Sequence, residues 1–414
     1  MQRSTDRILT THVGSLVRPP KIRDVMDAKE TGTDYDEAAF QEVLRTEVKA
    51  VVGRQAEIGI DVISDGEYGK AGWFRYLSER LGGLELREIR SGEKVKTPFD
   101  LARETTVFPD FYATYFPMMY LDWLPPDQTK TPIGRAPDGA APKADGKTMV
   151  WDCTGPITYR GLAAMNQDLD NFRIALADVQ VAEAFLPVAA PMSARGLWFN
   201  SHYPNEDEVH VALADALKEE YNAIVDTGFL LQVDDAYLAH EYDRMMGEMS
   251  EPEVRKHCEM CIDLLNYALE GIPPEKIRYH VCWGSWNAPH TTDIPLSKLA
   301  DFILKVNADA YSLEGANPRH EHEWQLWKDV KFPDGKILVP GVITHSTNVV
   351  EHPELIAMRI ANYASVVGKE NVIASSDCGF AQSYNIVRCH PDVQWAKLES
   401  LAEGAKLASK QLWQ

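Results

Sequence analysis

The feature that most constrains the fold of this chain is a regular alternation of short apolar runs with stretches of helical periodicity. Each run is followed by a polar or glycine-containing turn, which is typical of βα units. Eight such runs with intervening helices predict a closed parallel barrel. We therefore predict an α/β fold, a (β/α)8 barrel of the TIM type with long insertions, formed by residues 1–414 as a single domain. The predicted strands are Ile8–Val13, Asp61–Ser64, Thr148–Cys153, Phe229–Val233, Ile277–Cys282, Ala308–Leu313, Ile337–Val342 and Asn371–Ser375.

Two segments do not fit this alternation. Residues 82–147 contain a long stretch rich in Pro, Gly and Ala, and we interpret them as an inserted surface arm or lid and a candidate contact in a homo-oligomer. A ninth apolar run, Phe185–Pro191, contains two prolines, which argue against a central strand, so we assign it to an excursion over residues 185–205. Helices are expected at Glu206–Thr227, Glu251–Leu269 and Pro353–Val367.

The composition narrows the class of partner and the location. A formal net charge of −20 argues against nucleic acid, because phosphate binding requires clustered Lys and Arg. The first residues lack the apolar core of a signal peptide, and the sequence has no run long enough to span a bilayer. We expect a cytoplasmic protein that does not bind membranes. In that reducing compartment, the six unevenly spaced cysteines are expected to be thiols, some of them metal ligands.

Four side chains of types that bind metals lie at the carboxyl ends of predicted strands. His280 and Cys282 are two residues apart in one strand, so both side chains point to the same face. Glu314 follows the next strand, and Cys378 follows the last. Barrel enzymes build their sites at this end of the barrel, and one imidazole, two thiolates and one carboxylate suit a tetrahedral Zn²⁺. Taken singly, each residue is better explained as core packing or an ion pair; taken together, the four predict a zinc site.

Further polar residues follow other predicted strands on the same rim. Asp65 and Glu67 come after one strand, Asp234 and Asp235 after another, and His345 after a third. Carboxylates and an imidazole near a metal could hold a cationic ligand and transfer a proton. For Asp65 and Asp235 we prefer local roles, a turn and a helix cap, respectively.

Nine motifs in a fixed order resemble one known family. The chain is similar to the catalytic barrel of the cobalamin-independent methionine synthases, and more closely to shorter single-barrel relatives that include the epoxyalkane:coenzyme M transferases. The resemblance covers nearly the whole chain. The motifs are "TTHVGSLVRP", "SDGE", "CTGPITYRG", "LPVAAP", "LQVDDAYLA", "HVCWGS", "LEGANPRHEHEW", "GVITHST" and "SSDCGF".

The resemblance implies specific roles for these residues. It implies that His280, Cys282, Glu314 and Cys378 bind a catalytic zinc that activates a small, homocysteine-like thiol as the thiolate for methyl transfer to its sulfur. Glu314 would leave the metal when substrate enters, or act from outside the ligand set. The resemblance also implies that Ser15, Glu67 and Asp234 hold the backbone of the thiol substrate, and that His345 is the catalytic proton donor to the leaving group. Arg18 could hold an acidic group such as a sulfonate, or be a surface or salt-bridging residue.

The alkyl donor is left open. The full-length synthases have an additional N-terminal barrel that helps to hold folate and that is not found in this sequence, so folate, a corrinoid, an epoxide and a methyl ether all remain candidates. Epoxide opening by a zinc-bound thiolate is the nearest alternative to methyl transfer. A zinc hydrolase is less favoured, because two thiolate ligands make zinc a poorer Lewis acid. A structural zinc site is also less favoured, because such sites rarely lie on a catalytic rim.

Two other clusters have structural explanations. The "HEHE" segment at His320–Glu323 lies beyond a strand, where adjacent side chains diverge, and we interpret it as a network that braces the loop. Cys258 and Cys261 are three apart on the apolar stripe of a predicted helix and are expected to pack in the core. For Trp283 and Trp286 the sequence does not distinguish a pocket wall from core packing.

Overall fold

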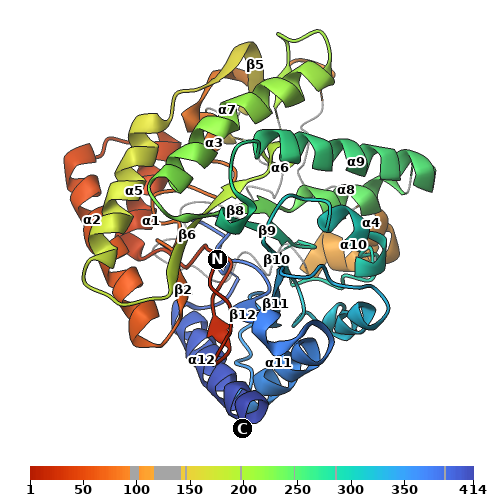
Figure 1. Cartoon of the computed structure of the whole chain (residues 1–414). Helices are drawn as coiled ribbons and strands as arrows, with labels where there is room; N and C mark the ends of the chain where they lie inside the picture. The colour runs from red at the N-terminus through yellow and green to blue at the C-terminus, as the bar shows by residue number, and fades with distance from the viewer. Residues whose placement is uncertain are drawn as a thin grey trace.

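The computed structural model describes residues 1–93, 102–115, 141–144, 147–195, 198–246, 248–284, 287–386 and 388–414. Within these residues, eight parallel strands form a ring that follows chain order (Figure 1). Leu9 pairs with Ile373, and a parallel bridge between Thr11 and Val62 joins the first two strands, so the ring closes. The predicted (β/α)8 barrel is therefore confirmed. Its strands are β1 (Leu9–Thr10), β2 (Val62–Ile63), β6 (Glu183–Ala189), β8 (Leu230–Asp235), β9 (Ile277–Val281), β10 (Ala310–Leu313), β11 (Ile337–Ile343) and β12 (Ile373–Ser376).

Helices surround this ring and bury their apolar faces against it (Figure 1). The long helices predicted from the sequence form as expected, and each ends within one residue of its predicted bounds. The longer helices are α1 (Pro20–Thr31), α2 (Glu37–Glu57), α5 (Leu162–Leu176), α7 (Glu206–Asp226), α8 (Tyr237–Met245), α9 (Glu251–Ala268), α11 (Pro353–Val367) and α12 (Pro391–Trp413). The shorter ones are α3 (Leu77–Arg80), α4 (Ala102–Val107), α6 (Pro191–Arg195) and α10 (Ala300–Ile303).

The last two long helices pack closely along the barrel wall (Figure 1). A Cβ atom at Gly404 of α12 would lie 2.5 Å from Cγ2 of Ile356 in α11, so a larger residue at position 404 would push the helices apart. α11 begins with Pro353 in its first turn, and the side chain of His352 accepts a hydrogen bond from the N–H of Glu354. The sequence therefore fixes both the start of α11 and its distance from α12.

Two strand assignments made from the sequence are wrong. The run Thr148–Cys153 belongs to β5 (Lys147–Tyr159), which lies outside the barrel and pairs antiparallel with β3 (Leu81–Glu88). The run at Phe185–Pro191 supplies the barrel strand instead, as β6, which pairs with β2 and β8. Apolar alternation identifies a strand but does not reveal which sheet it joins. The segment assigned to an excursion therefore begins in the barrel wall.

Pro187 is tolerated in β6 because of where its nitrogen points. The N–H of Ala190 donates to the carbonyl of Asp234 on β8, and successive residues of a strand alternate between their two neighbours. The nitrogen of Pro187 therefore faces the other side, where β2 has already ended at Ile63. The carbonyl oxygen of Pro187 accepts a hydrogen bond from the ammonium of Lys70. No ladder bond is lost, so the usual argument against proline in a central strand does not apply here.

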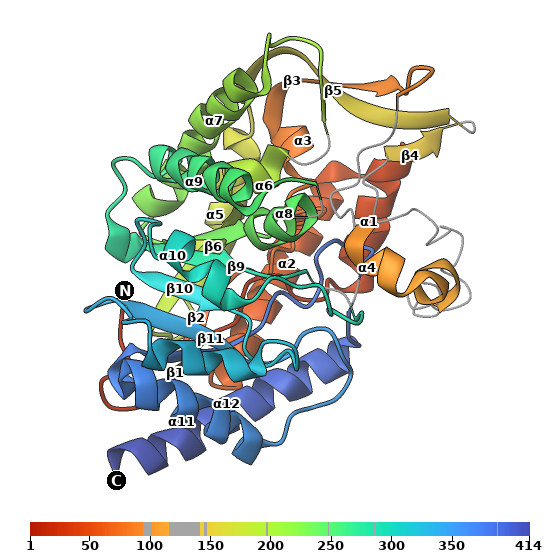
Figure 2. The same cartoon turned by 90° about the vertical axis from the view of Figure 1, so that its right-hand side faces the viewer.

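The second sheet lies beside the barrel and projects from it (Figure 2). It contains β3, β5 and β4 (Ala141–Ala144), and β7 (Phe199–Asn200) pairs with β5. The described parts of the insertion predicted over residues 82–147 are residues 82–93, which include most of β3, the segment 102–115, which begins with α4, the strand β4 and the first residue of β5. The rest of that insertion lies outside the described residues, and its role as an arm, lid or subunit contact stays a prediction. In the part of the chain that the structure describes, no helix has the length and apolar character needed to cross a membrane.

Candidate active site

Three of the four predicted metal ligands come together at the carboxyl end of the barrel. His280 is in β9, Cys282 lies just beyond it, and Cys378 follows β12. Their donor atoms all lie within 4.8 Å of one another, and all three side chains are buried. Because i and i+2 residues of a strand share a face, β9 delivers an imidazole and a thiol together. Cys378 completes the cluster from across the barrel mouth.

The donor atoms of this cluster have the chemistry that zinc requires. The Nδ1 atom of His280 lies 3.2 Å from Oγ of Ser312, whereas Nε2 has no hydrogen-bond partner among the described residues. Hydrogen bonding of the imidazole on one side commonly orients a metal ligand for binding through the other nitrogen. One nitrogen and two sulfur donors, buried and convergent, are a normal part of a tetrahedral zinc set. The residues therefore fit the metal that the sequence predicts.

The two thiols of the cluster interact with each other, and their pKa values shift in opposite directions. The hydrogen bond from Cys282, together with His280, holds the pKa of the Cys378 thiol well below its ordinary value. The same hydrogen bond, with burial, raises the pKa of Cys282. Burial alone would lower the pKa of His280, but the interaction with Cys378 outweighs burial and raises that pKa. These shifts favour negative charge on Cys378, beside the other two donors, where a cation would be stabilised.

Glu314 lies next to the cluster but outside the group of convergent donor atoms. Its Oε1 atom accepts a hydrogen bond from the N–H of Trp283 at 2.8 Å, and its Oε2 atom accepts one from the side chain of Asn317 at 3.1 Å. Burial raises the pKa of this carboxyl, and Cys378 acts in the same direction. The carboxylate therefore has existing partners on both oxygens, and its role as a fourth ligand stays a prediction.

Ser15 and Glu67 lie on segments that contact the Cys378 loop. The carbonyl of Ser15 accepts the N–H of Phe380 at 2.8 Å, and a Cβ at Gly379 would lie 2.0 Å from Ser15 Oγ. Glu67 has a left-handed backbone conformation with φ of 58°, and burial raises the pKa of its carboxyl. Strained residues of this kind are often found at functional sites.

Arg18 is buried, so the interpretation as a surface residue is wrong. Its guanidinium donates to the carbonyl of Glu67 at 2.7 Å and to that of Ala381 at 3.3 Å. It therefore ties the segment that carries Glu67 to the segment that follows Cys378. Both of these partners are backbone carbonyls, and the carboxylates of Glu67 and Asp65 also act on the guanidinium through their charge.

Asp234 faces the same site, whereas its neighbours have structural roles. The side chain of Asp234 accepts a hydrogen bond from Gln232 at 2.8 Å. Burial raises its pKa to about 8, and Glu67 and Cys378 contribute through charge repulsion. By contrast, Oδ1 of Asp235 accepts the N–H groups of Tyr237 and Leu238 at the start of α8. The expected cap is confirmed.

Asp65 also has the local role expected of it. Its Oδ1 atom accepts the N–H of Glu67 at 2.9 Å, two residues further on. This Asx-type contact fixes the turn that presents Glu67 at the rim. The contact with Asp65 therefore orients Glu67, whose carboxylate faces the site.

His345 follows β11 and is buried. Neither ring nitrogen has a hydrogen-bond partner within the described residues. Burial lowers the pKa of the imidazole to about 4, although Cys378 acts in the opposite direction. A neutral, unpartnered imidazole near an anionic sulfur is suited to exchanging a proton with a bound molecule.

The "HEHE" segment forms the bracing network expected from its position. The ring of His320 contacts Glu323 at 2.8 Å through Nδ1 and Asp293 at 3.0 Å through Nε2. Asp293 also contacts His290 at 2.8 Å, and the indole of Trp283 packs on His320 with a centroid distance of 4.6 Å. Trp283 is thus a packing residue that ties this network to the metal-site strand, whereas Trp286 lies outside the described residues.

The remaining cysteines match their expected roles. Cys258 and Cys261 are buried on α9 in the main apolar core. All six cysteines are free thiols, as predicted for a chain without a disulfide framework.

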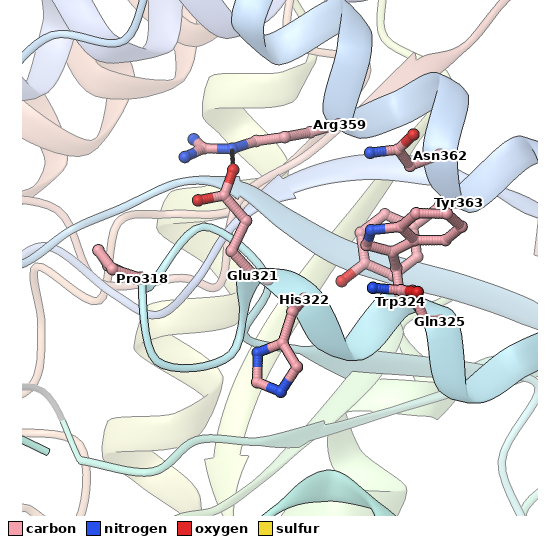
Figure 3. Close-up of a pocket in the computed structure, with 9 residues that line it drawn as sticks. Pro318, Glu321, His322, Trp324, Gln325, Arg359, Asn362 and Tyr363 are labelled. Atoms are coloured by element: carbon pink, nitrogen blue, oxygen red, sulfur yellow. Dashed lines mark hydrogen bonds and ion pairs between the residues drawn. The ribbon is translucent and has the colours of Figure 1, made fainter. Parts of the chain in front are cut away.

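A separate pocket lies between α11 and the 3₁₀ helix η5 (Glu321–Lys328) (Figure 3). Its volume is about 420 Å³, and one wall carries the ion pair between Glu321 and Arg359, with Nε 2.7 Å from the carboxylate. The pocket approaches the candidate site only through Gly315, the residue after Glu314. None of the predicted site residues is among the described residues that line it.

Several residues that shape the site were not predicted from the sequence. Asp377 is fully buried beside Cys378 and binds the backbone of the Glu314 loop, and Glu351 binds the backbone next to His345. His290 and Asp293 extend the bracing network. Adjacency to a predicted ligand was a signal for Asp377; the others contact the site only through the folded chain, and nothing local in the sequence marks them.

The fold is a (β/α)8 barrel, and its candidate metal centre, rich in thiols, lies at the end where barrel enzymes have their active sites. Comparisons with known proteins agree with this class of protein. The sequence model of the family described as "Cobalamin-independent synthase, Catalytic domain" matches residues 8–93. This match, together with the relatives described next, confirms the resemblance to the cobalamin-independent methionine synthase family.

Relatives and solved structures match over the length of the chain. The uncharacterized protein YxjH of Bacillus subtilis is 24% identical, with 95% of this chain and 92% of that protein covered. A methionine synthase of Saccharolobus solfataricus is 21% identical, with 97% and 95% covered. The structure of a B12-independent methionine synthase from Shewanella sp. W3-18-1, in complex with selenomethionine, has a TM-score of 0.66 at 17% identity and covers 98% of this chain and 99% of that one. The structural likeness supports the fold.

Proposed function

We propose that this protein is a zinc-dependent methyltransferase that transfers a methyl group to the sulfur of a small, homocysteine-like thiol. The observation that carries the proposal is the convergence of His280, Cys282 and Cys378 within 4.8 Å at the barrel mouth. The similarity to proteins named methionine synthase supports the choice of a thiol acceptor.

The metal would be held by these three residues, with Glu314 as the fourth donor. Bound zinc would supply Lewis acidity that keeps a substrate thiol, with an ordinary pKa of about 8.5, deprotonated at neutral pH. For Glu314 to bind the metal, its carboxylate must give up or share a hydrogen bond with Trp283 or Asn317. That requirement favours a weak fourth ligand that substrate can displace.

Acidic side chains around the cluster would hold the rest of the substrate. Glu67 and Asp234 repel each other electrostatically, and a substrate ammonium placed between them would relieve that repulsion. Ser15, beside Gly379, would bind the substrate's polar backbone. We assign Arg18 to positioning the Glu67 segment through the carbonyl contact described above, with any acidic group of the substrate as a second partner.

His345 would deliver the proton that the leaving group needs. A folate nitrogen leaves poorly unless protonated, and an opening epoxide produces an alkoxide that also requires a proton. The imidazole of His345 has no competing partner among the described side chains, so it could take up the proton that the substrate thiol releases and then pass that proton to either leaving group. Folate, a corrinoid, an epoxide and a methyl ether are the donors to be tested, and epoxide opening is the alternative reaction.

The first experiment tests the metal centre. Purified protein is expected to contain one zinc per chain by elemental analysis, and Cys282→Ala and Cys378→Ala are each expected to lose it. Cys389→Ala is the matched control, because that thiol is also buried but lies outside the cluster. Zinc content that is unchanged in Cys378→Ala would rule out the proposed ligand set.

The second experiment identifies the reaction. X-ray absorption with an added thiol is expected to show a third sulfur at the zinc, whereas a hydrolase or a structural site would show none. A panel of thiols is then combined with methylfolate, methylcobalamin, epoxides and aryl methyl ethers, and products are detected by mass spectrometry. His345→Gln is expected to retain zinc and to lose about 100-fold or more in kcat.

A further inference from the structure

His345 has no side-chain hydrogen bond within the described residues, so its position depends on the backbone that carries it. That backbone is the segment 344–351, between β11 and α11. We propose that Lys397 of the C-terminal helix and Glu351 form a buried pair that positions His345. This inference rests on the proposed function only in giving His345 a catalytic role; the effect of the pair on the segment can be measured separately.

Glu351 connects the segment to α12 through both of its carboxylate oxygens. Oε1 accepts the backbone N–H of Thr344, the residue before His345, at 2.8 Å. Oε2 lies 2.8 Å from the ammonium of Lys397. A single carboxylate therefore spans the distance between the helix and the start of the catalytic segment.

Lys397 and its helix hold the far end of the same segment. The ammonium of Lys397 also donates to the carbonyl of Val349, and the hydroxyl of Ser400, one turn further along α12, donates to the carbonyl of Glu351. Between these points, the side chain of Asn348 accepts the N–H of His390 at 2.9 Å. The segment is thus attached to α12 and its N-terminal flank at several points, and His345 lies at the end held by Glu351.

The burial of this pair argues for a specific role. The side chain of Lys397 is 0% exposed and that of Glu351 is 7% exposed. An ion pair in such a place costs desolvation, and well-packed apolar residues often give equal or greater stability. What an apolar pair could not do is accept the Thr344 N–H and bind the Val349 carbonyl. The charged pair fixes the geometry of a segment that would otherwise have unpaired backbone groups.

The anchor itself is held rigidly. Gly404 of α12 lies so close to Ile356 of α11 that no side chain fits between them, and Ile356 is fully buried. α11 begins directly after the segment, at Pro353. Both ends of the segment are therefore attached to the same pair of closely packed helices, so a change at Lys397 is transmitted to His345 and not absorbed by movement of α12.

The test uses the full-length, zinc-loaded protein. Lys397→Met keeps the aliphatic stem and removes the ammonium, and Glu351→Gln keeps an oxygen for Thr344 but removes the charge. Lys397→Arg is the conservative variant that should restore function in part. Lys406→Met is the matched control, because Lys406 is on the same helix, 71% exposed and 3.9 Å from Glu403.

Hydrogen exchange of the peptide that contains residues 344–351 is expected to rise by about tenfold or more in Lys397→Met. Zinc content and the KM for thiol should stay near the parent values, whereas kcat falls by about tenfold or more, because small displacements of a catalytic group are costly. Lys397→Arg should recover part of both the protection and the kcat, and Lys406→Met should match the parent protein.

Unchanged exchange in 344–351 for folded Lys397→Met overturns the proposal. So does a loss of kcat accompanied by equal loss of zinc, because that result would mean general damage to the site. If Lys397→Met does not fold, Glu351→Gln gives the same decision by the same measurements. If the parent protein transfers no methyl group, the exchange experiment still decides whether the pair holds the segment, so failure of the proposed function is distinguished from failure of this inference.

Discussion

The Oδ1 atom of Asp377 accepts a hydrogen bond from the backbone N–H of Gly315 at 2.8 Å, and this contact joins the loop after β10 to the loop after β12. The same oxygen accepts the N–H of Ala316 at 2.8 Å. A Cβ atom at Gly341, on the strand between them, would lie 2.1 Å from that oxygen. A carboxylate thus fits into space left by a glycine and fixes Glu314 relative to Cys378.

Asp377→Ala should weaken both folding and metal retention. Two buried hydrogen bonds to a carboxylate are lost, and we expect the free energy of unfolding to fall by about 2–4 kcal/mol, measured by urea denaturation. Zinc should dissociate faster during dialysis against a chelator. Asp377→Asn, which keeps one acceptor oxygen, serves as the control and should lie closer to the parent protein in both measurements; equal loss in the two variants would contradict the role given to the accepting oxygen.

Glu314→Gln tests whether Glu314 is a weaker metal ligand than the three proposed nitrogen and sulfur donors. The three nitrogen and sulfur donors remain in this variant, so we expect zinc to stay bound with an affinity about 10- to 100-fold lower, measured by competition with a chromogenic chelator. Cys378→Ala should abolish binding in the same assay. If Glu314→Gln binds zinc as tightly as the parent protein, Glu314 is not a ligand in the absence of substrate.

Gly14→Ala should impair substrate binding more than stability of the barrel. Gly14 has a φ of +137°, and an added Cβ would lie 2.8 Å from Cγ of Pro187 and 3.0 Å from Oε1 of Glu67. Because Glu67 is proposed to hold the substrate ammonium, its displacement should raise KM for the thiol by about tenfold, as expected when 1.4 kcal/mol of binding is lost. Gly92→Ala, also at positive φ but with no described atom within 4 Å of the added Cβ, is the control for backbone strain.

His320 should make stability depend on pH in the alkaline range. Burial alone lowers its pKa, but Asp293 and Glu323 raise it to about 10, above the ordinary value of 6.5. The folded state therefore binds the proton on His320 more tightly than the unfolded state does. This contribution is complete below about pH 6.5 and is lost as pH rises toward 10.

The measurement is urea denaturation at a series of pH values between 6 and 10. The parent protein should lose stability over this range, and His320→Gln should show a flatter profile with lower stability at pH 6. His322→Gln is the control, because that side chain lies outside the network. An identical slope in His320→Gln and the parent protein would exclude His320 as the group responsible.

Much of the barrel and the metal-binding cluster could be predicted because both depend on local signals. The buried runs before His280 and Cys378 mark strands, and parallel strands bring their carboxyl ends to one face. The strand at Phe185–Ala189 was missed because its tolerance of Pro187 depends on where β2 ends, which is a property of the assembled sheet. The run at Thr148–Cys153 was assigned to the wrong sheet because its pairing with β3 depends on tertiary structure and not on its own sequence.

The supporting residues of the site were missed for a related reason. Asp377 and Lys397 bind backbone groups of segments distant in sequence, and Glu351 links the nearby Thr344 to the distant Lys397. All three side chains are of types that usually lie on the surface. Nothing in their immediate neighbours distinguishes a buried carboxylate or ammonium from an exposed one. Such contacts become visible only when the helices and strands are placed in space.

The closure of the barrel has a consequence for biosynthesis. The N–H of Val13 donates to the hydroxyl of Ser376, which lies 363 positions later, so the first strand has no lasting partner on that side until nearly the whole protein has left the ribosome. His280 and Cys282 emerge well before Cys378, and a nascent chain at that stage presents only part of the cluster to metal. The complete set of donors for the proposed metal therefore exists only once the last strand has joined the barrel, so we expect metal loading to be a late step coupled to folding.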